Sequence, residues 1–469
     1  MKAMKATKAM KTSKMPKRNK PLKPRLKATK ARAIPQARRP PVPIPQAEVT
    51  VRGTNKTVPL HTIILAKICA RMLGQLPKKT VTELQRKLNK LGVLPTGSVC
   101  SGAGTDALAQ EVLLDVLGAK CKTEEVFSCE CEPFKASWLK SVVHADHGDH
   151  CVYCNVKDLN AEEAHCFTHS PPPSERSNNK SAKKCKVKAQ KILILSAGTS
   201  CKKLSKLMKD RAKFKGCMSD ESGSTGETLR ATIRLLQMYE VPFCLFENVG
   251  DLVEDAQDEN LIAMIRLLKE AGYACSYRKT CASRSMMPQR RGRVYFIAIN
   301  WRRCRRTFEE AKSITDEAMT IVAHLEGLNI LPFDLFLLPD NSKELEAFRV
   351  KFMEDKRAQP ELNDDNVWAR KALMLFDKRE ISWSSATVDE KTKASPWFSV
   401  LPTRQGQVLG FMSQWDPEGR TVDVIHAIDR AARSSFIPNS EYIGKADLLC
   451  SCVLPNCRMW DKKRCRLIL

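Results

Sequence analysis

The stretch ILILSAGTSCKKLS, residues 192–205, decides the fold of this chain. Four aliphatic residues in succession, followed at once by small residues, are typical of a buried parallel strand that ends in a tight turn. Cys201 comes directly after that turn. Ligands bind beyond the carboxyl ends of the strands in an open α/β sheet, so the Cys201 thiol is a candidate nucleophile. The alternative is a half-buried structural cysteine, the commoner role in a chain with 19 cysteines.

Composition indicates a globular protein of several domains with an anionic partner. The chain has 469 residues, of which 43% are hydrophobic and 28% charged, and this length predicts two or three domains. The formal net charge of +27 favours nucleic acid over an anionic membrane surface. No apolar run approaches the roughly 20 residues of a bilayer span, and the N-terminus lacks the apolar core of a secretory signal. We therefore expect no membrane partner, a reducing compartment and free thiols.

The N-terminal segment has the composition of a disordered basic tail, assigned to residues 1–50. Its first 47 residues contain no Asp, Glu or aromatic residue, so the segment cannot bury enough apolar area to fold alone. Such a tail binds phosphate backbones or acts as a nuclear import signal, which predicts a nuclear location; an inert tail and a transit peptide are the alternatives. Residues 51–95 are predicted to be a helical lead-in, with Thr80 and Glu83 spaced as in a capping box.

Glycines and acidic residues at the ends of the first three predicted strands indicate a nucleotide-like cofactor. Gly102 and Gly104 follow a short apolar piece and precede a helical stretch. The next strand candidate ends at Glu130, and a third leads to Asp158. A glycine turn after the first strand and a carboxylate after the second are typical of a βαβ unit that binds adenosine and its ribose.

Cys151 and Cys154 form a Cys-x2-Cys pair beside three histidines, His144, His147 and His150, a combination that raises the possibility of a zinc site. No second Cys-x2-Cys or spaced His pair completes four ligands, so we expect no metal there. A second cysteine-rich segment near the C-terminus is interpreted as buried thiols in preference to a metal clip: Cys450, Cys452, Cys457 and Cys465.

The motifs after Cys201 resemble those of the cytosine-C5 DNA methyltransferase family. Residues 247–249 read ENV and residues 289–293 read QRRGR, in the family's order and spacing around the cysteine. The resemblance covers residues 96–300, with a fainter similarity at the C-terminus. It implies an α/β fold with a doubly wound, Rossmann-like sheet that binds S-adenosylmethionine. It also implies that the catalytic domain of residues 96–300 is followed by a small inserted target-recognition region, 301–397, and a C-terminal return to the catalytic domain, 398–469.

The resemblance implies roles for individual residues in cofactor binding. The loop that binds the methionine part would be the glycine turn, the carboxylate that holds the ribose would be Glu130, and an Asp-Leu pair would contact the adenine. The cofactor-binding residues implied in this way are Ser101, Gly102, Gly104, Glu130, Asp158, Leu159 and Ser200. Cys100 stands where the family usually has Phe, and Ser200 stands where it has Pro before the nucleophile.

The resemblance also implies a catalytic mechanism with DNA as the partner. The implied catalytic residues are Cys201, Glu247, Asn248, Arg291 and Arg293. The thiolate of Cys201 adds to carbon 6 of cytosine, because carbon 5 is a poor nucleophile until the ring becomes an enamine. An acid at N3, assigned to Glu247, and a guanidinium at O2, assigned to Arg293, stabilise the charge on the ring. The base must be flipped out of the duplex.

Two other functions stay open from the sequence. A tRNA cytosine-C5 methyltransferase shares the core, but its Cys-Phe-Thr triplet occurs here at residues 166–168, before the nucleophile, which we interpret as coincidence. A catalytically weak relative that binds chromatin is favoured by Ser200, by Lys202 where Gln or Asn is usual, and by a degenerate closing motif near Gly444. The target sequence, the preference for maintenance or de novo methylation and the oligomeric state do not follow from the sequence.

Overall fold

The computed structural model of the chain describes residues 60–140, 150–169, 184–204, 216–219, 223–289, 291–337, 388–401, 403–417, 420–424 and 459–468, with part of 343–350. Two compact units divide the chain, Met1–Glu48 and Val49–Leu469, and every described residue belongs to the second. The predicted basic tail, the Gly444 segment, and Cys450, Cys452 and Cys457 lie outside the described residues.

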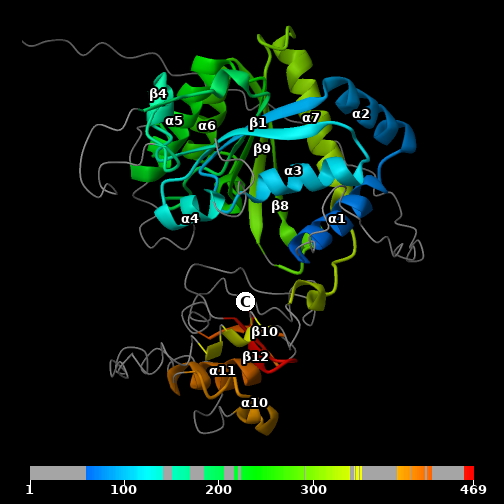
Figure 1. Cartoon of the computed structure of the whole chain (residues 1–469), viewed down its shortest axis with the longest axis vertical. Helices are drawn as coiled ribbons and strands as arrows, with labels where there is room; N and C mark the ends of the chain where they lie inside the picture. Colours follow the sequence, from blue (N-terminus) through cyan, green and yellow to red (C-terminus); the bar gives the residue numbers. More distant parts are fainter. Residues whose placement is uncertain are drawn as a thin grey trace, which may run out of the picture. The chain divides into compact units, whose positions relative to one another are not determined.

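A seven-stranded mixed sheet is the largest sheet of the described residues (Figure 1). Its strands, in spatial order, are β3 (Cys151–Tyr153), β2 (Lys122–Cys129), β1 (Val93–Val99), β6 (Ile194–Ala197), β7 (Phe243–Val249), β9 (Gly292–Asn300) and β8 (Tyr273–Cys281). The first five are parallel, and β9 is antiparallel to both of its neighbours. The strand order reverses between β1 and β6. This confirms the predicted α/β class with a doubly wound, mostly parallel sheet.

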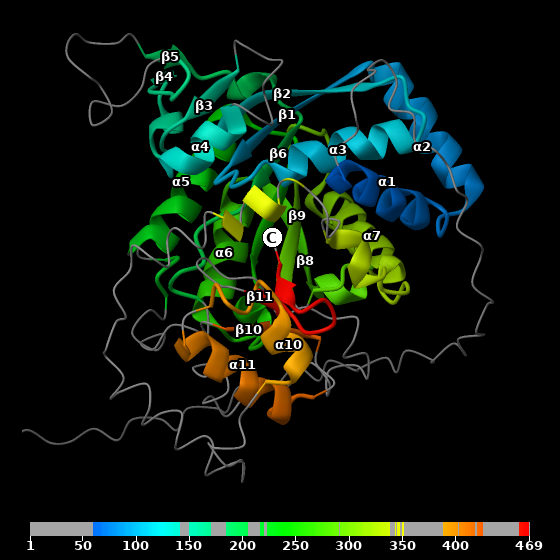
Figure 2. The same cartoon turned by 60° about the horizontal axis from the view of Figure 1, so that its bottom comes forward.

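Helices cover both faces of this sheet. Figures 1 and 2 show α1, α3 and α7 on one side and α5 and α6 on the other. The helices associated with the sheet are α1 (Leu60–Leu73), α2 (Lys78–Leu91), α3 (Thr105–Val116), α4 (Pro133–Trp138), α5 (Gly223–Tyr239), α6 (Glu259–Glu270) and α7 (Phe308–Leu325). None of the described helices combines the length and the apolar character that a membrane span requires.

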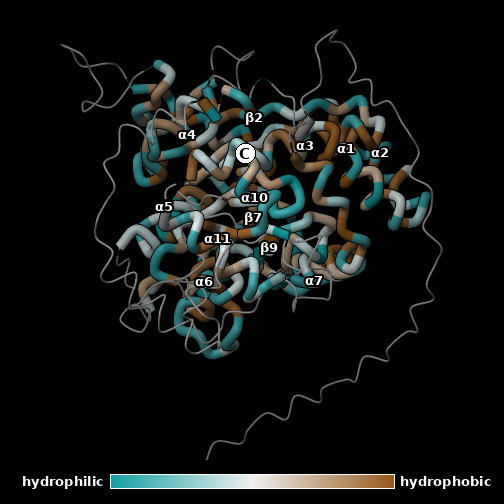
Figure 3. The backbone as a smooth tube through the Cα atoms, turned by 90° about the horizontal axis from the view of Figure 1, so that it is seen from below, coloured by the Kyte–Doolittle hydropathy of each residue, from teal (hydrophilic) through white to brown (hydrophobic). Residues whose placement is uncertain are grey.

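The predicted lead-in consists of two helices and the start of the first strand, since β1 begins at Val93. Ala66 and Cys69 of α1 are buried against Val112 of α3, and Figure 3 shows hydrophobic stretches of these two helices side by side. The first described helix is therefore part of the layer that covers the sheet.

The capping box predicted for Thr80 and Glu83 does not form. The helix α2 begins earlier, at Lys78, and its N-cap residue is Pro77, which provides no side-chain hydrogen bond. Pro77 has no side-chain acceptor, and its fixed φ, −56° here, is compatible with a helix that begins directly after it. Glu83 instead accepts a hydrogen bond from Arg86 at 2.9 Å, one turn along the same helix.

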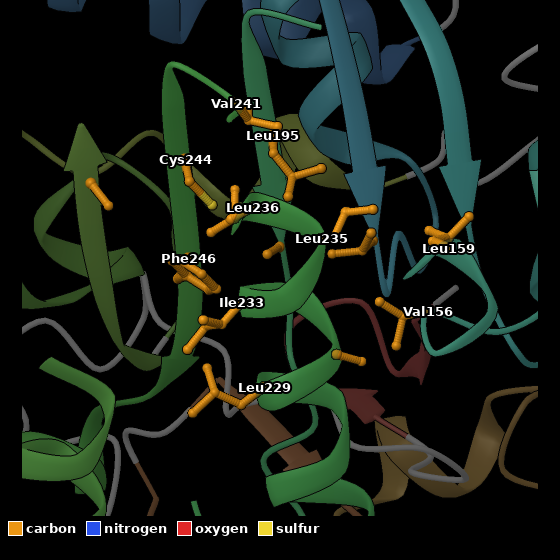
Figure 4. Close-up of a cluster of buried hydrophobic side chains, with 14 of the residues drawn as sticks. Val156, Leu159, Leu195, Leu229, Ile233, Leu235, Leu236, Val241, Cys244 and Phe246 are labelled. Carbon is orange, nitrogen blue, oxygen red and sulfur yellow. The ribbon is translucent and has the colours of Figure 1, made fainter. Parts of the chain in front are cut away.

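The inner face of α5 packs against the strand that the opening stretch forms. Leu229, Ile233 and Leu236 recur at intervals of four and three residues, which places them on one face of the helix. All three are at most 3% exposed and contribute to one core with Leu195 of β6 and Phe246 of β7 (Figure 4). Burial of each such side chain stabilises the fold by about 1.5–3 kcal/mol. This packing fixes the strand that delivers Cys201.

The described part of residues 398–469 forms a small sheet of its own. Its strands are β10 (Thr421–Asp423), β11 (Met459–Asp461) and β12 (Arg466–Leu467), and the helices α10 (Glu390–Ala394) and α11 (Thr403–Trp415) accompany them. Trp460, Phe411 and Val408 are among the residues of a separate hydrophobic core. The predicted return of this segment to the main sheet is not seen at β11, which pairs with β10 and β12. Trp460 of β11 is buried in this second core, and Met459 packs with Phe333 and Leu337.

A group of ion pairs links the small sheet to the 3₁₀ helix η8 (Phe333–Phe336). Arg420 lies 2.7 Å from the carboxylate of Asp334 and 3.1 Å from that of Asp461, which is fully buried. Arg464 binds the same Asp334 at 2.9 Å. The two guanidinium groups hold the pKa of Asp334 well below its usual range.

Candidate active site

The predicted site residues gather where the strand order reverses. In parallel strands the carboxyl ends share one edge, and β9 begins at that edge because it runs antiparallel to β7. The turn after β1, the loop after β6, the last residues of β7 and the first residues of β9 therefore meet there. Such a reversal point is where open α/β sheets bind ligands.

The glycine turn after β1 has a backbone that requires glycine. Gly102 and Gly104 have φ values of +59° and +69°, in the left-handed region that residues with a Cβ avoid. Ser101 joins this turn to the end of β2: its N–H donates to the carbonyl of Cys129 at 3.0 Å, and its hydroxyl accepts the Cys129 N–H at 3.1 Å. A Cβ placed on Gly102 would meet nothing within 4 Å, so the turn faces open space.

Glu130 is buried directly beyond β2, beside this turn. It is 5% exposed, and its Oε2 accepts the Gly102 N–H at 2.8 Å while its Oε1 accepts the Glu132 N–H at 3.0 Å. Each carboxylate oxygen keeps further acceptor capacity, since an ionised carboxylate accepts about four hydrogen bonds. Burial, with the charge of Glu130, raises the pKa of the neighbouring Cys100 thiol to about 12, so Cys100 stays a protonated thiol.

Asp158 and Leu159 occupy different environments in the 3₁₀ helix η2 (Asp158–Asn160). The Asp158 side chain is exposed. The Leu159 side chain is fully buried in the main core, as Figure 4 shows, and its N–H donates to the carbonyl of Val156 at 3.3 Å. The structure therefore presents Asp158, and not the side chain of Leu159, toward solvent.

The loop after β6 is held by hydrogen bonds to the first turns of α5. The Ser200 N–H donates to the hydroxyl of Thr228 at 3.2 Å, and the Ser200 hydroxyl lies 3.2 Å from that of Ser224. Farther along, the Lys203 N–H donates to Thr225 Oγ1 at 3.2 Å. These bonds flank Cys201 on both sides and give the loop the stiffness that a proline before the cysteine would otherwise supply.

Asn248 fixes the same loop from the neighbouring strand. It is 1% exposed, and its side-chain N–H groups reach the hydroxyl and the carbonyl of Thr199 at 3.2 and 3.4 Å. Its Oδ1 accepts the N–H of Val249 at 2.8 Å. Asn248 therefore positions the backbone two residues before Cys201, and it contributes no acid or base.

Glu247 and Arg293 form an ion pair across β7 and β9. Arg293 Nε lies 2.6 Å from Glu247 Oε1, with 18% and 34% of the two side chains exposed. Arg293 also donates to the carbonyl of Gly292 at 2.7 Å. The pair is fixed in orientation and accessible from solvent, as groups that contact a substrate must be.

The Cys201 thiol is half-buried within the fields of these charges. Burial raises its pKa; the positive charges of Arg293 and Arg291 act to lower the pKa, whereas the negative charge of Glu247 raises it. The net pKa of Cys201 is above the ordinary value, so the resting group is a thiol. The positive charges of the two arginines stabilise the thiolate that forms when this thiol loses its proton.

All five predicted catalytic residues thus lie at one edge of the sheet, and Glu130 and the glycine turn lie beside them. Sequence reasoning missed the side chains that hold the loop, namely Thr199, Ser224, Thr225 and Thr228. The run of small polar residues at 222–228 was the available signal. A thiol, a carboxylate and two guanidinium groups in this arrangement can add a nucleophile to a polar ring and stabilise the charge that forms on it.

Comparison with known proteins identifies the family. The model of the C-5 cytosine-specific DNA methylase family matches residues 144–405, more than half of the chain. A curated relative, DNA (cytosine-5-)-methyltransferase DMT5 of Cryptococcus neoformans var. grubii, is 24% identical over 287 residues. The match covers 60% of this chain and 10% of DMT5, so the chain spans about a tenth of that protein's length.

Solved structures give weaker matches. Dnmt2 methyltransferase of S. pombe aligns with a TM-score of 0.27 at 14% identity, over 44% of this chain and 50% of that chain. The Entamoeba histolytica methyltransferase EhMeth aligns with a TM-score of 0.28 at 9% identity, over 44% and 53%. At TM-scores this low, the assignment rests on the family model. By that match, the chain belongs to the C-5 cytosine-specific DNA methylase family.

Proposed function

We propose that this chain is an S-adenosylmethionine-dependent DNA (cytosine-5-)-methyltransferase that acts through Cys201. The observation that supports this most strongly is the Glu247–Arg293 ion pair at 2.6 Å, whose charges both act on the Cys201 thiol. A structural cysteine needs neither partner. A nucleophile that adds to cytosine needs both, since the ring must be protonated at N3 and held at O2.

The covalent step uses this chain's own residues. The Cys201 thiol loses its proton to solvent, and its sulfur forms a bond to carbon 6 of a flipped cytosine. The electron pair of the carbon 5–carbon 6 double bond shifts into the ring, and N3 gains a proton through Glu247. Arg293 holds O2 and stabilises the electron density that moves onto the ring. After carbon 5 has gained a methyl group, the carbon 5 proton leaves to solvent, the carbon 5–carbon 6 double bond re-forms and the sulfur–carbon 6 bond breaks. N3 gives up the proton that it gained, and the released thiolate takes a proton, which restores the free thiol. Asn248 keeps the nucleophile loop in place throughout.

The glycine turn and Glu130 fit the proposed cofactor. S-adenosylmethionine supplies the methyl group as an electrophile when bound. The buried Glu130 carboxylate has acceptor capacity for ribose hydroxyls, and the open space in front of Gly102 leaves room for a ligand close to the backbone. The exposed Asp158 is available at the adenine end. Ser200 holds the loop through α5 and would approach the cofactor only through that loop.

DNA is the proposed substrate, and the nucleus is the proposed location. The net charge of +27 favours a polyanion, and the basic tail of residues 1–50 supports phosphate binding and nuclear import. A tRNA substrate and a catalytically weak chromatin-binding role are the competing proposals. The family match to a DNA methylase favours DNA.

The test is methyl transfer from labelled S-adenosylmethionine to DNA, read as 5-methylcytosine by mass spectrometry, with tRNA in a parallel reaction. We expect product in DNA from the wild-type chain and none from Cys201→Ala. Cys304→Ala is the matched control, because Cys304 is a free, half-buried thiol that lies outside the site. Product in tRNA alone would favour the tRNA enzyme, and cofactor binding without product in either would favour the weak relative.

A further inference from the structure

Four potential metal ligands lie together outside the active site. They are the thiols of Cys151, Cys166 and Cys185 and the imidazole of His169, and their ligand atoms all lie within 4.8 Å of one another. His169 Nδ1 is 3.5 Å from the sulfur of Cys151, 3.5 Å from that of Cys166 and 3.7 Å from that of Cys185. The sulfurs of Cys166 and Cys185 are 3.5 Å apart.

Backbone pairing brings these residues together from separate parts of the chain. Cys151 begins the edge strand β3, and Cys166 is adjacent to that strand through a bridge to Tyr153. Cys185 lies in β5 (Cys185–Lys186), which pairs with β4 (Glu163–Ala164), and Figure 2 shows both short strands near β3. The Tyr153 hydroxyl donates to the carbonyl of Lys186 at 2.7 Å, which fastens β5 to β3.

The spacing of the four ligand atoms is that of a tetrahedral zinc site. Ligands at the usual zinc distances, about 2.3 Å for sulfur and about 2.0–2.1 Å for nitrogen, lie about 3.6–3.8 Å from one another at the corners of a tetrahedron. Four of the six separations between these atoms are 3.5 to 3.7 Å, in agreement with that geometry, and all six are within 4.8 Å. The His169 N–H also donates to the Cys166 sulfur at 3.1 Å, a bond that stabilises a thiolate ligand.

The types of the four ligands indicate which metal the site would bind and whether that metal would be structural or catalytic. Three thiolates and one imidazole in a tetrahedron suit Zn²⁺ and not the hard cations Mg²⁺ or Ca²⁺, which prefer oxygen. Four protein ligands leave no open position for water, so the site would be structural. Cys151 and Cys166 are buried, whereas His169 is exposed, which leaves a path for the metal to enter.

We propose that Cys151, Cys166, His169 and Cys185 bind a structural Zn²⁺ that fastens the β4–β5 hairpin to the edge strand β3. The proposal departs from the expectation, drawn from the sequence, of no metal in this region. The Cys-x2-Cys pair that prompted the zinc interpretation is not the site, since Cys154 lies outside the group. His150 is not a ligand of this site either, because its Nε2 lies 3.1 Å from the hydroxyl oxygen of Ser128.

The experiment measures zinc in the purified full-length chain by inductively coupled plasma mass spectrometry, after expression in zinc-supplemented medium. We expect Cys166→Ser and His169→Ala each to lose about one zinc per chain relative to the wild type. Cys154→Ser is the matched control and should keep the full zinc content. His169→Cys should also keep it, because a fourth thiolate completes an equivalent tetrahedron.

A variant can lose zinc because it misfolds or because it lacks a ligand, and a second measurement, on the wild-type chain and on His169→Cys, distinguishes these two causes. Replacement of zinc by Co²⁺ should give the intense visible absorption of tetrahedral thiolate coordination, and His169→Cys should shift that spectrum without abolishing it. Equal zinc content in the wild type, Cys166→Ser and His169→Ala would overturn the proposal. A metal-free wild type with Cys166 and Cys185 joined as a disulfide would also overturn it.

Discussion

Glu247→Gln separates the catalytic role of Glu247 from its structural role. Glutamine has nearly the same shape and keeps an oxygen acceptor for Arg293 Nε at the 2.6 Å contact, but it loses the charge. Charge-assisted hydrogen bonds contribute about 1.5–3 kcal/mol and are roughly twice as strong as neutral ones. Because the two side chains are 18% and 34% exposed, solvent screens the pair, and we expect a loss of about 1 kcal/mol in the free energy of unfolding.

The effect on methyl transfer should be much larger. A positioned acid contributes about 10²–10⁴ in rate, which corresponds to about 3–5 kcal/mol of transition-state stabilisation.

The rate at which iodoacetamide alkylates Cys201 should rise in Glu247→Gln, whereas the rate of methyl transfer falls. The charge of Glu247 raises the pKa of the thiol, so its removal lowers that pKa and makes alkylation at neutral pH faster.

The assay compares single-turnover methyl transfer with the alkylation rate of the Cys201 peptide, followed by mass spectrometry. Arg293→Gln is the control of opposite sign: it removes a charge that lowers the thiol pKa, so both methyl transfer and alkylation should be slower. The reasoning is refuted if Glu247→Gln slows alkylation together with methyl transfer, or if methyl transfer falls by less than about tenfold.

Three further predictions follow from the described contacts. Asn248→Ala removes two hydrogen bonds to Thr199 and the one accepted from the Val249 N–H. At about 1 kcal/mol each, their loss should lower the free energy of unfolding by about 3 kcal/mol in a urea titration, and kcat should fall with little change in KM. Gly102→Ala should cost about 1–2 kcal/mol, because φ is +59°, and should weaken S-adenosylmethionine binding by calorimetry, because the added Cβ enters the open space. The hydrogen bond to Arg420 lowers the pKa of Asp334 in the folded chain. The ionised carboxylate therefore stabilises the fold fully above the unfolded pKa of about 4, and this stabilisation decreases as the pH falls toward the folded pKa. Asp334→Asn should flatten the pH dependence of the urea midpoint between about pH 5 and 2.5.

The sequence predicted the sheet and its edge because those features depend on short local patterns. An uninterrupted aliphatic run followed by small residues is typical of a strand buried on both faces. The strand β6 contains the second half of that run, Ile194 and Leu195, and continues through Ser196 and Ala197, with Ile194 half-buried. Once the parallel strands are assigned, their carboxyl ends must share an edge, and the family resemblance assigns Cys201 and Glu247 to the ends of two of these strands. The antiparallel β9 brings Arg293 to the same edge.

Features that depend on tertiary placement were not predictable. The burial of Leu159 follows from the packing of α5 over η2, which its position after Asp158 does not reveal. The hydrogen bonds from Asn248 to Thr199 join residues 49 positions apart. The proposed zinc ligands are spread from Cys151 to Cys185 and match no standard spacing, because two-residue strands, which carry almost no periodic signal, bring them together.

The small sheet of β10, β11 and β12 shows the same limit. Its strands have two or three residues each, and Arg420 pairs with Asp461, 41 positions away, in a buried contact. The family resemblance predicted only that residues 398–469 return to the catalytic domain. The apolar side chains that pack around Trp460 place this segment in a core of its own.

The central claim is that Cys201 forms a covalent bond to cytosine in DNA. The most direct test is to trap that bond with duplex DNA containing 5-fluorocytosine, since fluorine at carbon 5 cannot leave as the proton does. With S-adenosylmethionine present, we predict a denaturation-resistant adduct whose modified peptide contains Cys201, retained in Cys304→Ala and lost in Cys201→Ala. An adduct at another cysteine, or none in a wild-type chain that methylates DNA, would contradict the account.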